Sequence, residues 1–214
     1  MTSNPERLAY WYLRLNGFLL LEDFIIHPDE GSDQRTDIDL LGVRFFHRAE
    51  NCIHPMQDDP RITRCNKLCN VIITEVKKGQ CALNGPWTNP KDRNIHRILT
   101  AIGCIPRANI KMAAKNLYES GCYHYGNISC QLISIGNSPG NIAIPNVPQI
   151  LFTNVIEFIF NRFRDYQKQK ASTGNWSSDG QKLKELAFRY NEKIEFDKQV
   201  RIFFGLIDNG EIPV

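Results

Sequence analysis

The sequence predicts an α/β protein whose mixed central β-sheet of about four to five strands is flanked by helices. The first observation is the order of patterns along the chain: a helix, three strands, helices, a fourth strand and further helices. The second is that no helix is predicted between the first three strands, which favours an antiparallel meander. The third is the helical crossover before the fourth strand, which favours parallel pairing of that strand.

Composition and charge are those of an ordinary globular chain. Of the 214 residues, 42% are hydrophobic and 23% are charged, so neither a disordered chain nor a fibre is expected. The net charge of +3, from 26 basic and 23 acidic residues, is too small to indicate a nucleic-acid-binding protein by itself. No apolar run is long enough to span a membrane, and the N-terminus lacks a secretory signal pattern. Seven scattered cysteines argue against a disulfide scaffold, so we expect a cytoplasmic protein.

The first helix is predicted from the segment Asn4–Glu6, which supplies an N-cap asparagine, a proline at the first helical position and an acidic first turn. The helix is expected to end at Asn16–Gly17. The dense apolar run Phe18–His27 fits a buried strand, and a turn is expected at Pro28–Ser32.

Two further strands follow, separated by a long loop. Asp37–Phe46 is rich in Ile, Leu, Val and Phe, and Val71–Val76 is built of β-branched residues. The loop between them, residues 47–70, is polar and contains prolines, and it is longer than a hairpin needs. The third strand is expected to end at Lys77–Gly79.

The second half of the chain is predicted to be mainly helical. Expected there are helices from Asn89–Pro90 to about Gly103 and from Arg107 to Ser120, a fourth strand at Tyr123–Ile135, a loop at Gly136–Pro148, and helices at Pro148–Lys170 and Gln181–Phe204. We therefore expect a core of residues 1–147 and C-terminal helices, residues 148–214, that pack on this core within a single domain.

The side chains that point to chemistry are Asp39, Glu75 and Lys77. Glu75 and Lys77 are two residues apart on a strand, so their side chains leave the same face. The strand is otherwise apolar, and an unpaired ion is costly there. Asp39 and Glu75 can donate oxygens to Mg²⁺, which prefers carboxylates to imidazole or thiolate ligands. Lys77 would then lie beside an attacking water and a phosphate.

With these residues the sequence resembles the PD-(D/E)xK nuclease superfamily, which has the restriction-endonuclease-like fold. The family pattern is a helix bearing a Glu, a strand, an Asp in the second strand and Glu-x-Lys in the third. The matching residues here are Glu6, Asp39 and Glu75-Val76-Lys77. The resemblance covers roughly residues 4–77 and extends loosely to Gly136. No proline precedes the Asp, which departs from the family signature.

The resemblance implies an αβββαβ core and a Mg²⁺-dependent phosphodiesterase that cleaves nucleic acid, with Mn²⁺ as a possible substitute. Asp39 and Glu75 would be metal ligands, Lys77 would position the attacking water, and Glu6 would be an accessory catalytic residue. DNA is favoured over RNA because most members of the family act on DNA in restriction, repair or antiviral defence. A homodimer is a plausible assembly. The alternatives are a catalytically inactive nucleic-acid-binding or scaffold module and an RNA-directed nuclease.

Other interpretations of the same residues stay open. Glu75 and Lys77 could form a surface ion pair of under about 1 kcal/mol. Asp37 lies two residues before Asp39 and projects from the same face, but Asp39 directly precedes the apolar part of its strand. Glu6 is also favoured by the helix dipole alone.

Two further groups of residues could bind ligands. The basic residues Lys78, Arg93 and Arg97 follow the predicted site, and the two arginines, four apart on one helix, could hold phosphates. Neutral cysteines are the simpler interpretation of the second group, but four soft ligands in or beside the long loop could hold Zn²⁺: Cys52, His54, Cys65 and Cys69.

Overall fold

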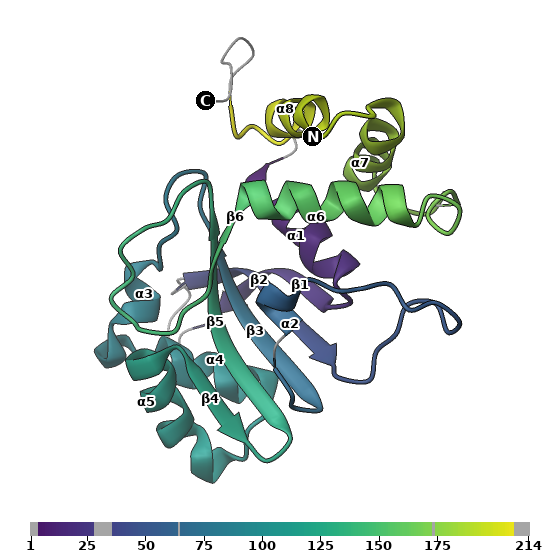
Figure 1. Ribbon diagram of the computed structural model, residues 1–214. Coiled ribbons are helices and arrows are strands. Elements are labelled where there is room, and N and C mark those ends of the chain that lie inside the picture. The colour runs from purple at the N-terminus through teal and green to yellow at the C-terminus, as the bar shows by residue number, and fades with distance from the viewer. Residues whose placement is uncertain (1–3, 28–35, 64, 173, 208–214) are drawn as a thin grey trace.

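The fold is a six-stranded mixed sheet with helices on both faces, as seen in a computed structural model (Figure 1). The structure describes residues 4–27, 36–63, 65–172 and 174–207, so the turn expected at Pro28–Ser32 lies outside the described residues. The strands are β1 (Leu19–Ile26), β2 (Thr36–Phe45), β3 (Cys69–Val76), β4 (Cys122–Tyr125), β5 (Ile128–Gly136) and β6 (Gln149–Leu151). The α/β class and the mixed, helix-flanked sheet are confirmed.

The strand directions agree with the predicted topology. The sheet order is β1-β2-β3-β5-β4, and β6 pairs with β5. β1, β2 and β3 form an antiparallel meander, whereas β5 returns parallel to β3 after the helical crossover. β4 is antiparallel to β5, and β6 is parallel to it. The central strands β2, β3 and β5 are therefore fixed on both edges.

Two hydrophobic cores lie on opposite faces of the sheet. One core packs the sheet against α1, α6, α7 and α8, and the other packs it against α3, α4 and α5 (Figure 1). The helices are α1 (Pro5–Leu15), α2 (Pro60–Thr63), α3 (Gly85–Thr88), α4 (Asn94–Ile102), α5 (Ile110–Ser120), α6 (Phe152–Asp165), α7 (Ser178–Arg189) and α8 (Lys193–Phe203), with short 3₁₀ turns at Pro90–Asp92 and Arg107–Asn109. The C-terminal helices share a core with α1, so they pack on the N-terminal part of the chain.

The first strand differs from the prediction in its burial. β1 is an edge strand, and its side chains Leu19 and Leu21 are 67% and 57% exposed. The expectation of a buried strand was wrong, because an apolar run does not show whether helices cover both faces of the strand. Here Leu20 packs on one core and Phe24 on the other, while the side chains between them face solvent.

The predicted fourth strand is a hairpin. The chain turns between β4 and β5 at Gly126, whose φ of +53° suits glycine. β6 was missed because three residues between a loop and a helix show no period-two pattern. The single C-terminal helix expected at Gln181–Phe204 is two helices, α7 and α8, because the backbone of Tyr190 is extended.

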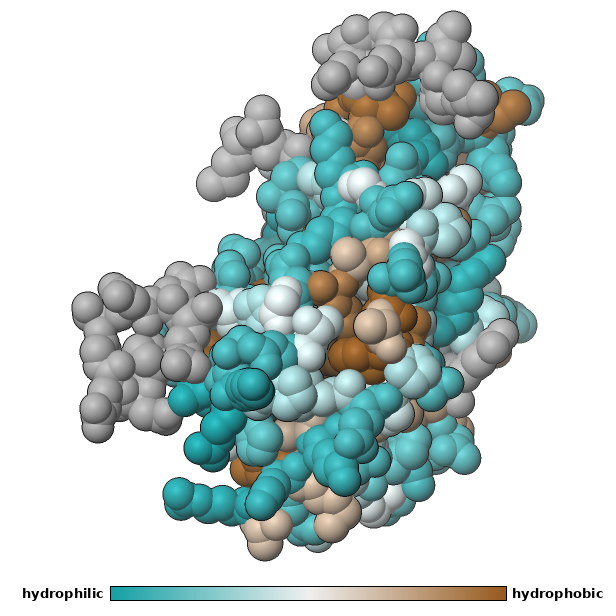
Figure 2. All heavy atoms as spheres, turned by 90° about the vertical axis from the view of Figure 1, so that its left-hand side faces the viewer, coloured by the Kyte–Doolittle hydropathy of each residue, from teal (hydrophilic) through white to brown (hydrophobic). Residues whose placement is uncertain are grey.

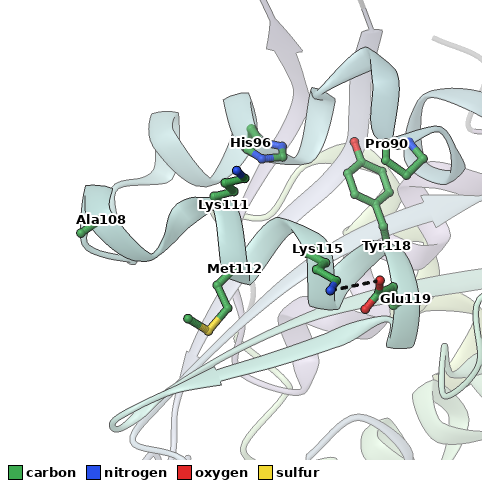
Figure 3. A pocket seen from close by; sticks show the side chains of 8 residues that line it. All are labelled: Pro90, His96, Ala108, Lys111, Met112, Lys115, Tyr118 and Glu119. Carbon is green, nitrogen blue, oxygen red and sulfur yellow. Dashed lines mark ion pairs between the residues drawn. The ribbon is translucent and has the colours of Figure 1, made fainter.

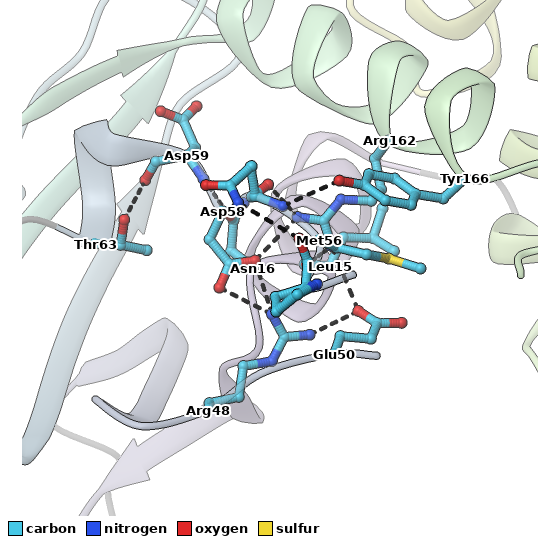
Figure 4. A network of polar contacts seen from close by, with 12 residues as sticks. Leu15, Asn16, Arg48, Glu50, Met56, Asp58, Asp59, Thr63, Arg162 and Tyr166 are labelled. Atoms are coloured by element: carbon cyan, nitrogen blue, oxygen red, sulfur yellow. Dashed lines mark hydrogen bonds and ion pairs between the residues drawn. The ribbon is translucent and has the colours of Figure 1, made fainter. Parts of the chain in front are cut away.

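A buried ionic network fixes the long loop between β2 and β3. The carboxylate of Asp58 accepts hydrogen bonds from three arginines, Arg44, Arg48 and Arg162, at 2.7–2.9 Å (Figure 4). Arg162 comes from α6, and its side chain is 1% exposed. Its Nη1 also donates to the carbonyl oxygen of Leu15 at 2.8 Å, at the end of α1. The network therefore ties the loop to α1 and α6 on one face of the sheet.

Replacing Arg162 with alanine is expected to lower the free energy of unfolding by about 3–5 kcal/mol, because the buried carboxylate of Asp58 would lose a partner. Chemical denaturation measures this change. Arg164→Ala is the matched control: this arginine is half-buried on the same helix and has no ion pair among the described residues. A loss for Arg162→Ala no larger than for Arg164→Ala would contradict the assigned role.

Candidate active site

The sheet brings Asp39 and Glu75 together. β2 and β3 are antiparallel with Leu40 opposite Thr74, the last pair of their ladder, and Asp39 and Glu75 are the next residues of the two strands. The charge of Asp39 acts on the carboxyl group of Glu75, so the two side chains lie near each other. Asp39 Oδ2 also accepts a hydrogen bond from the backbone N–H of Val76, at 2.6 Å. The Asp39 carboxylate is thus held against the end of β3.

The edge of the sheet is irregular at this position. Ile38 packs in the core under α4 and α5, whereas Leu40 packs in the core under α1 and α6. Side chains two residues apart on a regular strand share a face, so β2 is distorted at Asp39. The facing residue on β1, Asp23, has a φ of +48°, and the ladder is interrupted there. Such irregularities change the direction in which a side chain leaves the strand, and here the irregular position is Asp39.

The Glu75 carboxylate is buried, 3% exposed, and is held by three donors. Oε1 accepts from Lys77 Nζ and from Asn84 Nδ2, and Oε2 accepts from the indole Nε1–H of Trp87 at 2.7 Å. Trp87 is itself 1% exposed and comes from α3. The bonds fix the orientation of the carboxylate and leave about one of its four lone-pair positions open.

Burial and neighbouring negative charges raise the pKa values of the two carboxyl groups at this edge of the sheet. Desolvation raises the pKa of Asp39, although the Val76 N–H and Lys77 oppose the shift, and the charges of Glu6 and Asp37 add to it. Desolvation likewise raises the pKa of Glu75; the hydrogen bond from Lys77 opposes this shift, and the charge of Asp39 adds to it. The structure therefore brings Glu6, on the first turn of α1, near Asp39.

Lys77 is positioned by its backbone as well as by its ion pair. Its N–H donates to the carbonyl oxygen of Ile135 at 2.8 Å, which extends the β3–β5 ladder by one residue. The side chain is 28% exposed, so the ammonium group contacts both Glu75 and solvent. Lys78, the next residue, is exposed.

The two predicted phosphate-binding arginines are placed differently from the prediction. α4 begins at Asn94, so Arg93 is not in the helix but caps it in the left-handed region, with a φ of +55°. Arg97 is in the helix and donates from Nη1 to the carbonyl oxygen of Asp92 at 2.8 Å. The expectation of two arginines on one helical face was therefore wrong, although both line the same surface groove described below.

The possible zinc ligands are not assembled. Cys52 lies exposed on the loop, and Cys69 begins β3. Within the described ranges, no three side chains of the types His, Cys, Asp or Glu form a group that could hold a metal ion. This finding also applies to the edge of the sheet where Asp39 and Glu75 lie.

Comparison with known proteins does not assign the chain. No protein family, curated protein or solved structure matches it.

In the described part of the chain, no helix combines the length and the apolar character needed to cross a bilayer. On the side of the molecule where α3 lies, hydrophilic side chains dominate, and hydrophobic ones gather near the centre (Figure 2).

Sequence reasoning missed Asn84 and Trp87 as partners of Glu75. Trp87 is 1% exposed, so its ring is not available to stack on a base. A signal was present, because a tryptophan that follows a buried strand needs a partner for its indole N–H, and the nearby carboxylate was the available acceptor. The spacing alone did not show that the turn at Asn84–Trp87 folds back onto β3.

Asp39→Asn is expected to become more stable relative to the native protein as pH rises. The raised pKa values mean that the folded protein binds protons more tightly than the unfolded chain, whose ordinary values are 3.8 for Asp and 4.5 for Glu. The stability from these groups is therefore present below about pH 4 and is lost as pH rises through the folded-state values. Denaturation of both proteins in chelator from about pH 4 to 8 measures the difference. A difference in unfolding free energy between the two proteins that does not change with pH would contradict the raised pKa values.

Trp87→Phe is expected to destabilise the fold by about 1–3 kcal/mol beyond the loss of ring volume, because a buried carboxylate oxygen loses its donor. Trp176→Phe is the matched control: it removes the same atoms from a partly buried indole whose N–H has no hydrogen bond among the described residues. Equal losses of unfolding free energy in the two variants would show that the indole N–H does not hold Glu75.

Proposed function

We propose that this chain is a metal-dependent nuclease of the PD-(D/E)xK type, with the restriction-endonuclease-like fold, acting on DNA. The observation that carries the proposal is the hydrogen bond from the Val76 N–H to Asp39, which holds this carboxylate at the residue between Glu75 and Lys77, themselves joined in an ion pair. The order of helix, three antiparallel strands, helical crossover and parallel strand supports it. So does the position of Glu6, whose charge acts on Asp39.

The donor set suits Mg²⁺. Burial is the main cause of the raised pKa values of Asp39 and Glu75, and a cation beside the two carboxyl groups would favour their charged forms. Mg²⁺ commonly keeps several waters and takes one or two protein carboxylates with substrate phosphates, so a third protein ligand is not required. Asp39, whose Oδ1 accepts no hydrogen bond from the described residues, and the open lone pair of Glu75 would hold the ion. When bound, Mg²⁺ would supply Lewis acidity at the phosphate and lower the pKa of water.

The protein side chains have separate roles in this proposal. Lys77 keeps Glu75 ionised through its ion pair, and its exposed side can orient a water for in-line attack on phosphorus and face the developing negative charge. Asn84 and Trp87 are positioning residues, because they act on Glu75 and fix its free lone pair. Glu6 can accept a proton or orient a water from the helix side of the site.

Lys77→Ala is expected to keep the fold but lower kcat for Mg²⁺-dependent DNA cleavage by at least about 100-fold, the usual effect of removing one group that stabilises developing charge. Lys78→Ala removes the neighbouring charge and is expected to raise KM with little change in kcat. Cleavage of plasmid and linear DNA with Mg²⁺, Mn²⁺ or chelator measures both. Equal kcat in Lys77→Ala and the native protein would remove the proposed role of Lys77.

The three hydrogen bonds on Glu75 favour a second candidate function, a nucleic-acid-binding module that keeps the fold without catalysis. In that case the donors would compete with a metal ion for the carboxylate. Calorimetric titration with Mn²⁺ separates the two functions, because heat of binding that disappears in Asp39→Asn supports the nuclease. DNA binding without any metal binding supports the module.

A further inference from the structure

A groove of about 870 Å³ lies between the C-terminal half of β1 and the helices α4 and α5. One wall is the edge strand, with Phe24, Ile25 and Ile26, and the other comes from α4, the 3₁₀ turn at Arg107–Asn109 and the start of α5. Phe24 is half-buried and Ile25 is 43% exposed, so part of the groove surface is apolar and open.

The polar lining of this groove is basic. Among the described residues that line it, four are cationic, two are histidines and none is acidic: Arg93, Arg97, Arg107, Lys111, His27 and His96. Arg107 and Lys111 are exposed, and neither side chain forms an ion pair or hydrogen bond with another described residue. Burial lowers the pKa of His96, and the charges of Arg93, Arg97 and Lys111 lower it further, which shows that the cations gather around one point.

Both walls of the groove approach the acidic edge of the sheet. Asn94, at the start of α4, donates from Nδ2 to the carbonyl oxygen of Pro86, the neighbour of Trp87, which in turn holds Glu75. On the opposite wall, Phe24 pairs with Ile38, the residue before Asp39. Elements that line the groove therefore also contact residues beside Glu75 and Asp39.

A second hollow continues the concave surface. It has a volume of about 580 Å³ and shares His96 and Lys111 with the groove (Figure 3). Its remaining lining includes Met112, which is 55% exposed, and Tyr118. Lys115 is paired with Glu119 at 3.8 Å across the far end of this hollow, whereas Arg107 and Lys111, which form no ion pair with another described residue, line the groove.

We propose that the groove binds a single-stranded stretch of nucleic acid, with phosphates on Arg107 and Lys111 and a base against Phe24. A duplex presents phosphates outside and keeps its bases stacked inside, so it would leave the apolar wall without a partner. A single strand offers both a charged backbone and exposed base faces, which match the two kinds of surface in the groove. The inference deepens the proposed nuclease function, because the groove would lead the strand to Asp39 and Glu75.

The test measures binding of fluorescein-labelled single-stranded DNA of about 12 nucleotides by polarisation, with the same sequence as a duplex for comparison. Chelator is present throughout, so binding is measured without cleavage. The variants are Arg107→Ala with Lys111→Ala, which removes two cations of the groove, and Phe24→Leu, which keeps an apolar side chain but removes the aromatic ring. Lys168→Ala is the matched control, since Lys168 is exposed beyond the end of α6.

We expect the full chain to bind the single strand more tightly than the duplex. The double variant should weaken binding at least about tenfold and reduce the slope of log affinity against log salt by about 0.7 for each lost contact. Phe24→Leu should reduce the ratio of single-strand affinity to duplex affinity. Lys168→Ala should change neither this ratio nor the affinity for the single strand. Tighter duplex binding, or a double variant equal to the control, would overturn the groove assignment. If DNA binding depends on the groove but the protein does not cleave DNA in Mg²⁺, the nuclease function is refuted and the groove assignment stands.

Discussion

The candidate site depends on one constraint, a carboxylate that is buried at the end of the central strand β3. Glu75 sits where burial disfavours its charge, and Lys77, Asn84 and Trp87 offset that cost with three hydrogen bonds. Each donor comes from the residues that follow β3, so the chain must fold back onto the strand immediately after leaving it. Asp39 then lies at the end of the same strand because its carboxylate accepts a hydrogen bond from the N–H of Val76, the residue after Glu75.

The two faces of the sheet support different parts of this arrangement. On one face, α1 carries Glu6 toward Asp39 and is anchored through the buried network around Asp58 and Arg162. On the other face, α3 supplies the indole that holds Glu75, and α4 begins against it and forms a wall of the basic groove. Acidic and basic surfaces therefore adjoin, which is the arrangement needed to bring a polyanion to a cation-binding edge.

The sequence predicted the parts of the fold that depend on local periodicity. The alternation of side chains placed Glu75 and Lys77 on one face of a strand, and the order of elements gave the parallel return of β5. The hairpin was missed although Gly126-Asn127 is a local turn signal, whereas burial of β1 was predicted incorrectly because it depends on which helices cover the sheet. The partners of Glu75 were missed for a similar reason, since Asn84 and Trp87 reach it through a tertiary turn that spacing does not encode. Arg93 lies outside α4 because its left-handed backbone starts a new helix after the 3₁₀ turn.

The central claim is that Asp39 and Glu75 together hold one divalent cation. Crystals of the protein soaked in Mn²⁺, with anomalous diffraction measured, address this directly. We predict an anomalous peak in contact with oxygens of both carboxylates, and loss of that peak in crystals of Asp39→Asn. Fully ordered Asp39 and Glu75 side chains with no peak between them at saturating Mn²⁺ would contradict the account.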